Sequence, residues 1–486
     1  MRRIFSNPIP PLAAGFCLRL FFVLKFPANS GDTVLYEQMA TNWLKHHVYA
    51  MDVGGVVTAV DLRMPGYPAF LAVIYALTGR TAADARLWVM LAQILVDLGT
   101  CVAIAFLARR FAPGDGKAGF VSALWLSALC PFVANYTAVP LTEVWAVFFT
   151  TQALIGLVEL IHRPPELEAI LKRSEFVKSR ELFKVAGLAG LFCGVGTLFR
   201  PEAPILLVAA IPIIYWVLSS QAGWKRALTT VCIAAAPCIL PLIPWAIRNA
   251  VTLHEVQFLA PKNSNLPGEL VPYGFMAWEK TWLYRVRDCY LVPWKLNDES
   301  IDLDSIPARA FDTPDEKERV GAILEQYNTD LTLTPEEDAD FARLARERTS
   351  RHPLRTYIRL PLARAVTIWF TPRIELLPVS GNVFPLAQTH ADDPVDQATT
   401  VGLFLLNLLY LGLAVWGAIR LCLWNPAAKP VVLLIAAFLV LRTGFLSTLE
   451  TPEPRYVLVC FPAIIALAAQ VFPRTPAATP QSSGSG

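Results

Sequence analysis

The stretch Ser30-Gly31-Asp32-Thr33-Val34-Leu35-Tyr36 follows the first hydrophobic run of the chain, and it puts a carboxylate where a membrane would meet water. Residues 33–45 carry apolar and polar side chains on opposite sides at helical spacing. One side holds Leu35, Tyr36, Met39, Ala40, Trp43 and Leu44, and the other holds Glu37, Gln38, Thr41, Asn42 and Lys45. This pattern predicts a helix lying in the membrane interface, with Trp and Tyr as anchors. Asp32 has two interpretations, an N-cap of this helix or a functional carboxylate.

The composition is typical of membrane proteins. Of the 486 residues, 55% are hydrophobic and 17% are charged, and the mean hydropathy is +0.45. Repeated apolar runs of about 20 residues predict an all-α polytopic membrane protein. The net charge of +3 is small. Basic residues with interleaved aromatics do not cluster outside the loops that flank spans, so nucleic acid is not an expected partner.

The apolar runs predict about 10–11 membrane spans. Ten of them lie at about 8–27, 85–108, 118–135, 141–161, 185–199, 203–219, 227–247, 399–420, 430–448 and 456–472. Residues 357–371 fit either a short eleventh span or an interfacial helix. Loop parity favours the interfacial helix, with the C-terminus in the cytoplasm. The first external loop, 28–83, holds a second apolar run at 69–77, which is too short to cross a bilayer and predicts another interfacial helix.

The chain is expected to divide into three parts and a tail. Residues 1–247 form a transmembrane catalytic module with spans 1 to 7, and residues 357–472 form a second transmembrane module. A hydrophilic helical insert, 248–356, lies between them on the external side. The tail, 473–486, is rich in Pro, Thr, Ser and Gly and is expected to be disordered.

The insert carries two helix starts that the sequence makes visible. Thr313-Pro314-Asp315-Glu316 and Thr334-Pro335-Glu336-Glu337 are both typical of capping boxes, and they predict helices over about 314–327 and 335–350. Asp302-Leu303-Asp304 resembles a metal-binding DxD signature. No alternation of strands and helices surrounds it, so we assign it no such function.

Basic residues mark alternate loops and therefore predict the orientation of the chain. They are Arg2/Arg3, Arg109/Arg110/Lys117, the 162–184 loop and Lys225/Arg226. Such loops belong in the cytoplasm. The opposite, external face then collects Asp32, Arg63, Glu143, Arg200, Glu202 and Arg248.

Each of these charges also has a local explanation. Arg200 could pair with Glu202, Arg455 could pair with Glu453, and Arg248 at the end of its span could snorkel. These local explanations do not account for the position of all these residues on the same, external side of the membrane, because external loops normally carry few arginines. Ionisable residues at spans are functional candidates by default.

Carboxylates and arginines at one membrane surface suit the transfer of a sugar from a lipid phosphate. A carboxylate can take the proton of an acceptor hydroxyl as general base. Arginines can hold the departing phosphate through paired donors and permanent charge. The lipid tail would lie in a groove between spans. The sequence contains no Walker loop or GxGxxG motif, so it offers no recognisable nucleotide-binding site.

Six motifs give the chain a resemblance to a known family. They are Gly31-Asp32-xxx-Tyr36, Arg63-xx-Gly66-Tyr67-Pro68, Pro140-Leu141-Thr142-Glu143, Leu198-Phe199-Arg200-Pro201-Glu202, Pro244-Trp245-xx-Arg248-Asn249 and Glu453-Pro454-Arg455-Tyr456. Over about 1–260 and 355–472, the chain resembles GT-C class membrane glycosyltransferases of the family 39 type. That group contains the protein O-mannosyltransferases and the lipid A aminoarabinose transferase.

The resemblance implies an inverting transferase that moves a sugar from a polyprenyl-phosphate donor to a hydroxyl of a lipid, glycan or protein acceptor. It implies Asp32 as the general base and Glu143 as a second catalytic acid, and it leaves open a divalent metal held by both. The residues implied in binding the donor and its phosphate are Tyr36, Arg63, Tyr67, Arg200, Glu202, Arg248, Arg455 and Tyr456, with Arg373 as a weaker addition. Relatives often have a second acid directly after the first, whereas Thr33 stands here.

The same resemblance implies a cell-envelope protein of the bacterial inner membrane, surrounded by membrane lipids, with its site facing the periplasm. Two other function classes compete with it. A transporter or lipid flippase should show internal repeats and polar or broken helices near the middle of the membrane, and no repeat relates the halves of this sequence. A non-catalytic membrane scaffold would leave the external charges unexplained.

Overall fold

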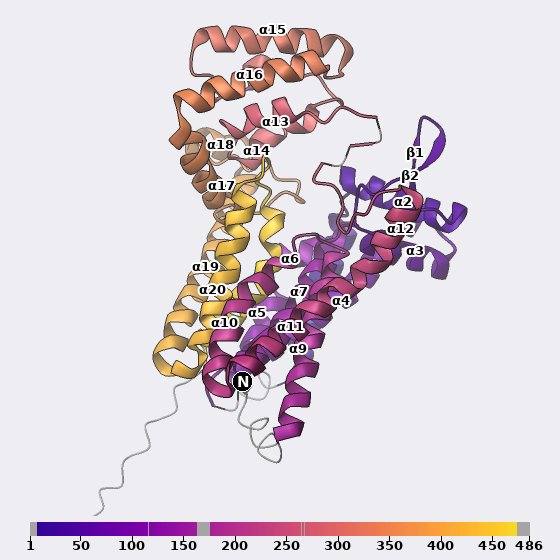
Figure 1. The fold of residues 1–486 in the computed structure, drawn as a ribbon. Coiled ribbons are helices and arrows are strands. Elements are labelled where there is room, and N and C mark those ends of the chain that lie inside the picture. The colour runs from indigo at the N-terminus through magenta and orange to yellow at the C-terminus, as the bar shows by residue number, and fades with distance from the viewer. Residues whose placement is uncertain (1–6, 115, 163–174, 264, 267, 474–486) are drawn as a thin grey trace, which may run out of the picture.

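The structure, a computed structural model, shows an all-α polytopic membrane protein (Figure 1). It describes residues 7–114, 116–162, 175–263, 265–266 and 268–473, with only the backbone of 175–179. Seven helices in this part of the chain are long and apolar enough to cross a membrane, or eight if a pair bent by 51° counts as one span. They are Ala82–Phe111, Glu143–Ile161, Ile205–Ala222, Trp224–Thr252, Pro394–Trp424, Pro426–Ser447 and Pro454–Val471, with the bent pair Lys117–Ala128 and Pro131–Ala138.

These helices, with the bent pair counted as one, lie close to eight of the ten predicted spans. The helices at the other two, Ile9–Lys25 and Glu175–Thr197, are not among those long and apolar enough to cross a membrane. The long elements of the bundle are α1 (Ile9–Lys25), α4 (Arg86–Phe111), α5 (Lys117–Ala128), α7 (Glu143–Ile161), α9 (Glu175–Thr197), α10 (Ile205–Ala222), α11 (Trp224–Ile239), α12 (Ile243–Thr252), α19 (Pro394–Trp424), α20 (Lys429–Ser447) and α21 (Phe461–Ala468). Short elements join or extend them, namely α6 (Pro131–Ala134), η2 (Ala82–Ala85), η3 (Asn135–Ala138), η4 (Leu240–Leu242), η9 (Pro426–Ala428), η10 (Pro454–Cys460) and η11 (Ala469–Val471). The seventh span was predicted to end at 247, and the helix instead continues to Thr252.

Small residues let the helices of the bundle approach closely. A Cβ added at Gly190 would lie 1.9 Å from the Ala234 carbonyl oxygen, and one at Gly417 would lie 1.9 Å from that of Leu467. Such glycines allow backbone-to-backbone packing where lipid supplies no hydrophobic driving force between helices. Arg19 interrupts the apolar run of α1, and its side chain is fully buried against Asp97 with a 2.6 Å ion pair. The charge is therefore compensated inside the bundle.

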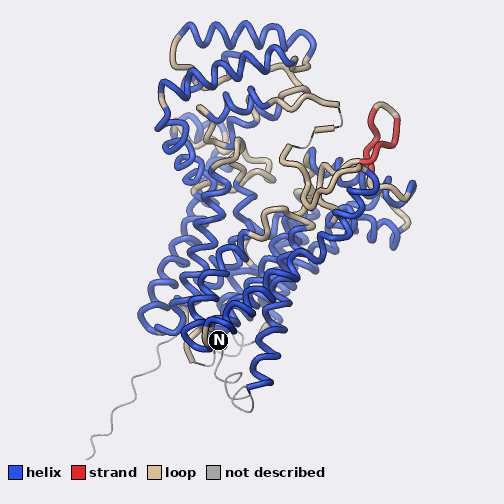
Figure 2. The backbone as a smooth tube through the Cα atoms, viewed as in Figure 1, coloured by secondary structure: helices blue, strands red, loops and turns tan. Residues whose placement is uncertain are grey.

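The first external loop of the prediction folds into two helices with a hairpin between them. These are α2 (Gly31–His46), β1 (Ala50–Val53), β2 (Val56–Ala59) and α3 (Gly66–Thr78). Figure 2 shows that the strands of the described chain are confined to this hairpin, whose register pairs Ala50 with Ala59. The sequence analysis predicted both helices but not the hairpin.

The N-cap interpretation of Asp32 is wrong. Ser30 is the N-cap of α2, and it forms a capping box in which its side chain accepts from the Thr33 N–H and the Thr33 side chain accepts from the Ser30 N–H. The expected polar side of α2 also needs correction. Glu37 and Asn42 are buried. Glu37 meets Arg86 at 2.7 Å, which lets it face inward as half of an ion pair.

The insert is a small helical layer with its own core. Its main helices are α13 (Tyr273–Lys280), α14 (Val286–Cys289), α15 (Pro314–Asp330) and α16 (Pro335–Arg351), joined by η5 (Pro293–Lys295), η6 (Leu303–Ser305) and η7 (Ala308–Ala310). Trp278, Trp282 and Phe341 lie at the centre of that core. Both predicted helices are present, and Thr334 forms the full capping box. Thr313 caps α15 alone, because Glu316 accepts instead from the Asp312 N–H.

The ambiguous segment 357–371 is not a span. A π-helical turn, η8 (Arg355–Arg359), leads into α17 (Leu360–Trp369), which has ten residues and is too short to cross a bilayer. The short helix α18 (Leu386–Asp392), which was not predicted, follows. The predicted tail lies almost wholly outside the described residues, and so does most of the basic 162–184 loop.

The two ends of the bundle differ. We call the end that carries α13 to α16 the insert end. Figure 1 shows α2, β1 and β2 toward this end, whereas the turn between α10 and α11 lies at the other. The predicted cytoplasmic Lys225 belongs to that turn. The insert and the first loop thus share one end, as the alternation of basic loops requires.

The arrangement predicts that the insert end and the α10–α11 turn lie on opposite sides of the membrane. Single cysteines replacing Asp315 and Lys225, both exposed, should react with a membrane-impermeant maleimide from opposite sides of sealed vesicles. The natural exposed cysteines, Cys17 and Cys232, are first replaced by serine. Labelling of both sites from the same side would contradict the topology.

A second prediction concerns the contact that docks the first loop. Gly66 donates its N–H to the Leu198 carbonyl at 2.8 Å, and an added Cβ would lie 2.5 Å from that oxygen. Gly66→Ala should therefore lower the free energy of unfolding by about 1–3 kcal/mol, measured as a lower thermal midpoint in detergent. Gly99→Ala is the control, because nothing lies within 4 Å of its Cβ position in α4. Equal midpoints for the two variants would refute the close contact.

Candidate active site

Charged side chains from five separate segments meet at one place. Asp32 lies in the first turn of α2, Arg63 just before α3, Glu143 at the start of α7, Arg200 after α9, and Arg455 in η10. Arg455 and Asp32 are 423 positions apart in the chain and are hydrogen-bonded. We call these five residues the charge cluster. The sequence analysis selected all five, and the structure brings them together.

Contacts made by neighbouring residues hold these segments together. The Thr33 hydroxyl donates to the Pro140 carbonyl at 3.2 Å, which fixes the start of α2 beside the motif that ends in Glu143. Trp145 of α7 stacks on Phe199 with ring centroids 5.5 Å apart. That stacking places Arg200, the next residue, against the start of α7. Residues next to the charged side chains therefore connect these segments, in addition to the ion pairs.

Asp32 is held by two arginines. Its Oδ1 lies 2.6 Å from Arg63 Nη2, and its Oδ2 lies 3.1 Å from Arg455 Nη2. Burial alone would raise the pKa of Asp32, but the two guanidinium charges outweigh it and lower the pKa to about 2. The carboxylate keeps 22% of its side chain exposed. It is therefore ionised at neutral pH and open to an incoming group.

Glu143 is the deeper of the two acids. Its side chain is only 3% exposed, and Oε1 is paired with Arg200. The same oxygen lies 3.8 Å from Arg455 Nη1. Its other oxygen, Oε2, finds no hydrogen-bond partner among the described residues. One guanidinium, that of Arg455, therefore lies between Asp32 and Glu143.

Arg455 has a third carboxylate partner. Its Nε lies 2.6 Å from Glu453 Oε2, so the local pairing expected from the sequence is present. The Tyr456 hydroxyl donates to Glu453 Oε1 at 2.5 Å. The guanidinium carbons of Arg200 and Arg455 lie 5.3 and 5.5 Å from the centre of the Tyr456 ring. This ring attracts both cations and keeps them near each other.

The expected ion pair between Arg200 and Glu202 does not form, and Glu202 has a different partner. Glu202 instead binds Arg442 of α20 at 3.0 Å, and Arg442 also donates to the Tyr456 carbonyl at 2.8 and 2.9 Å. Glu202 and Arg442 therefore support the backbone beside Arg455. Arg442 was missed in the sequence, although a lone arginine inside an apolar span is itself a signal.

Two of the residues that were predicted to bind the sugar donor, Arg248 and Arg373, lie outside the charge cluster. Arg248 donates to the carbonyls of Tyr49 and Val60 at 2.6 and 2.8 Å, and its guanidinium carbon lies 5.2 Å from the Trp245 ring centre. It lines a separate cavity of about 440 Å³ between α2, α3 and α12. Arg373 is buried and donates to Asn407 and to the Pro454 carbonyl. It therefore anchors the start of η10 instead of facing the cluster.

The two remaining predicted tyrosines pack behind the cluster. Tyr67 is fully buried, and its hydroxyl donates to Gln93 at 2.7 Å. Tyr36 is also buried, with its ring 5.1 Å from that of Tyr67. Burial, followed by the charge of Asp32, raises the pKa of Tyr36 to about 12. Tyr36 therefore stays protonated next to Asp32, whereas Tyr67 does not reach the site.

The groups that surround the two acids are guanidinium groups of arginines, and not further metal ligands. Asp32 and Glu143 both face guanidinium groups, and the described residues contain no group of three or more His, Cys, Asp or Glu that could hold a metal ion. A divalent cation would have to displace Arg455 to bind both carboxylates. We therefore derive no chemical step through a metal.

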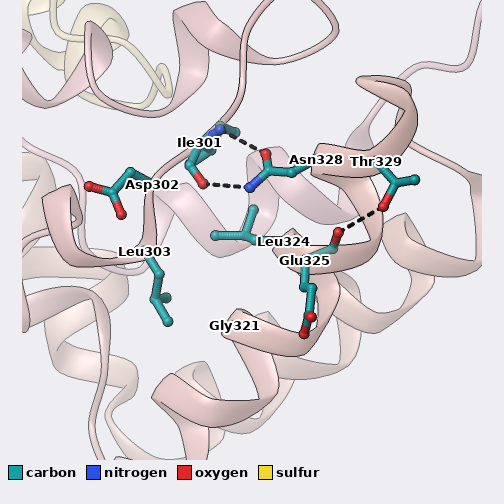
Figure 3. A pocket seen from close by; sticks show the side chains of 8 residues that line it. All are labelled: Ile301, Asp302, Leu303, Gly321, Leu324, Glu325, Asn328 and Thr329. Atoms are coloured by element: carbon teal, nitrogen blue, oxygen red, sulfur yellow. Dashed lines mark hydrogen bonds between the residues drawn. The ribbon is translucent and has the colours of Figure 1, made fainter.

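The DxD-like motif has structural roles. Figure 3 shows the hollow that it borders in the insert, where the carboxyl groups of Asp302 and Glu325 point in different directions with Leu324 between them. Asp302 accepts from the Asp304 N–H, and Asp304 pairs with Lys317 at 2.9 Å. Both acids are thus part of the local fold of η6.

The sequence matches no protein-family model and no curated protein. Its structure is similar to solved structures of the Archaeoglobus fulgidus oligosaccharyltransferase AglB at 12% identity. The apo form gives a TM-score of 0.49, with 95% of this chain and 50% of that chain covered. The complex with an inhibitory peptide and a dolichol-phosphate gives 0.48 with the same coverage. The chain spans about half the length of these structures, and a likeness of this degree carries no argument about function.

The bridge made by Arg455 predicts a pH-dependent loss of stability when it is removed. Arg455→Met leaves Asp32, Glu143 and Glu453 without a shared cation, so the free energy of unfolding at pH 7 should fall by about 3 kcal/mol. The Asp32 share of this loss is complete above about pH 4 and fades as pH falls toward 2, because the lowered pKa of Asp32 stabilises the fold only while the carboxylate is ionised.

Thermal midpoints in detergent at pH 7 and pH 2.5 measure this effect. Arg343→Met is the matched control, because Arg343 pairs with Asp340 on the exposed surface of α16 and should cost at most about 1 kcal/mol. A deficit for Arg455→Met that is no larger than the control, or that grows as the pH falls, would contradict the bridge.

Proposed function

We propose that the chain is a GT-C type membrane glycosyltransferase. It transfers a sugar from a polyprenyl-phosphate donor to an acceptor hydroxyl, with inversion at the sugar carbon and Asp32 as general base. The observation that carries the proposal is the single guanidinium of Arg455 between two carboxylates, with Arg63 and Arg200 on either side. This grouping supplies both a proton acceptor and a cradle for a departing phosphate.

The chemical step is one displacement. The acceptor oxygen attacks the anomeric carbon while its proton passes to the Asp32 carboxylate. The bond between that carbon and the phosphate oxygen breaks, and its electron pair stays on the lipid phosphate. A single displacement inverts the configuration at the anomeric carbon. The donor leaves as polyprenyl phosphate, whose added negative charge the arginines compensate.

Donor binding would also strengthen the base. In the free protein, Arg63 and Arg455 hold the pKa of Asp32 at about 2, which makes it a weak proton acceptor. A phosphate competes with the carboxylate for the same guanidinium groups, since both are bidentate anionic acceptors. As the arginines turn toward the phosphate, their hold on Asp32 weakens and its pKa rises. The base thus gains strength only when a donor is present, which limits idle proton transfer.

The cavity beside Arg248 supports a membrane-borne donor. Its lining is mostly apolar, with aromatic walls from Trp43, Tyr49 and Trp245, and Gly66 and Leu198 connect it to the segments that carry Arg63 and Arg200. An isoprenoid tail fits such a lining, and Arg248 lies where the charged head leaves the lipid. This assignment gives Arg248 a role in donor binding outside the charge cluster.

The finer parts of the proposal follow from the same site. Glu143 orients the acceptor or Arg455, and Tyr456 holds Arg200 and Arg455 in place. A mannosyl or aminoarabinosyl donor, the bacterial inner membrane and a periplasm-facing site are the expectations that complete it.

Transport is the second candidate function, and no contact in the described residues favours it. Arg19 and Asp97, the buried charges of α1 and α4, are fully occupied by each other and by nearby partners.

Asp32→Asn tests the base. Ser30 and Thr33 supply the cap of α2, so the substitution leaves the cap intact. It removes the proton acceptor together with the negative charge that pairs with Arg63 and Arg455. We expect a folded protein that binds donor and has lost about 10²–10⁴-fold of its turnover. Release of free polyprenyl phosphate from a panel of polyprenyl-phosphate sugars measures the rate. Glu143→Gln should lose less.

Asp84→Asn is the matched control, since Asp84 is an exposed acid in the same loop region and its loss should leave the rate unchanged. Wild-type turnover in Asp32→Asn would refute Asp32 as the base. Failure of the wild-type protein to release polyprenyl phosphate from any donor of the panel would refute the enzymatic proposal.

A further inference from the structure

A cavity in the insert lies next to the charge cluster and has no role so far. It has a volume of about 360 Å³, within the range of small-molecule sites, about 300–1,000 Å³. Its lining comes from α13, from the residues around η5, and from the loop before η10. The lining residues used below are Lys262, Asn263, Glu279, Trp294 and Glu450.

Glu279 is a buried carboxyl group with one oxygen, Oε1, that is unpaired among the described residues. The residue is 2% exposed, and no donor among the described residues reaches its Oε1. Burial, with the charge of Glu450 as a second cause, raises the pKa of Glu279 well above its ordinary value. Burial thus favours the protonated form, and a protonated carboxyl group can both donate and accept a hydrogen bond. A buried polar group left unpaired costs stability, so a ligand partner is the physical reason to keep it.

Aromatic and polar groups surround this acid. The Trp294 side chain is 40% exposed, and its ring lies 4.4 Å from that of Tyr290 at an angle of 80°. Glu450 is held by Lys280 at 2.7 Å and Lys262 at 3.3 Å. The cavity thus presents an aromatic face together with carboxyl, amide and ammonium groups.

The cavity is joined to the charge cluster by a short piece of chain. Glu450 and Thr451 line it, and the Glu453 N–H donates to the Thr451 carbonyl at 3.0 Å. Glu453 is the carboxylate that binds Arg455. A molecule in the cavity is therefore close to the proposed reaction centre.

We infer that this cavity is the acceptor subsite and that it binds a sugar residue of a glycan acceptor; the inference rests on the proposed transferase function. Neighbouring hydroxyls of a sugar each donate and accept, which matches the mixed lining of Glu279, Asn263 and Glu450. The apolar face of a sugar ring packs on an exposed indole such as Trp294, whose ring is amphipathic. A peptide bound by strand addition would need a free strand edge, and the strands of the described chain lie in the β1–β2 hairpin, which does not line this cavity.

Calorimetric titration of the full-length protein in detergent tests the inference without any donor. The probes are short oligosaccharides of hexoses, N-acetylhexosamines and pentoses, and a set of short peptides containing serine or threonine is the alternative. We expect at least one oligosaccharide to bind and the peptides not to bind. Trp294→Ala should weaken binding by about tenfold, because it removes the aromatic platform. Trp88→Ala is the matched control, since Trp88 is 46% exposed in α4 and lines none of the cavities described above.

Glu279 gives a second, independent readout. Glu279→Gln keeps a donor and should bind oligosaccharide within about threefold of the wild type, whereas Glu279→Met should weaken binding by about tenfold. Because Oε1 is unpaired, the methionine variant should unfold at an equal or higher temperature. A purely structural carboxyl would give the reverse, a lower thermal midpoint with unchanged binding.

Three results would overturn the inference. They are no binding by any oligosaccharide of the panel, unchanged affinity in Trp294→Ala, and binding of peptides in place of oligosaccharides. Donor turnover measured on the same preparations separates this failure from failure of the proposed function. A protein that releases polyprenyl phosphate but shows one of these results keeps the function and loses the glycan subsite.

Discussion

The guanidinium of Arg455 is the constraint on which the rest of the site depends. It lies between Asp32 and Glu143 and is itself fixed by Glu453 and by the Tyr456 ring. Without it, acids from separate segments would repel one another in a poorly solvated place. Gly66 docks the first loop on the turn after α9, and the stacked rings of Trp145 and Phe199 hold α7 against the same turn. These contacts make the short distances around the Arg455 cation attainable.

Charge compensation explains why so many ionisable groups tolerate a membrane boundary. Each acid of the cluster meets an arginine, and Glu202 and Arg442 repeat the arrangement one layer behind. Such pairs add little stability in themselves, because desolvation offsets most of the attraction. They are better understood as a poised arrangement, in which an arriving phosphate can exchange with a carboxylate for the same donors at small net cost.

The sequence predicted the secondary-structure elements better than it predicted which charged side chains pair with one another. Helix starts such as that of Thr334 are local, and spans follow from composition, so both could be predicted. The pairing of Glu202, in the turn after α9, with Arg442 of α20 depends on the approach of two segments 240 residues apart, which no local pattern encodes. The β1–β2 hairpin was predictable but was missed. Gly54 and Gly55 both adopt positive φ, and a Gly-Gly pair between β-branched residues is a typical two-residue hairpin turn.

The position of Arg455 in the chain has a consequence for biogenesis. The residue enters the site from η10, at the start of the final span, whereas its carboxylate partners Asp32 and Glu143 are made far earlier. A partly synthesised or truncated chain therefore exposes uncompensated acids at the membrane surface. The helix that begins with η10 inserts after the segments that carry both acids, and it therefore acts as the closing element of the centre.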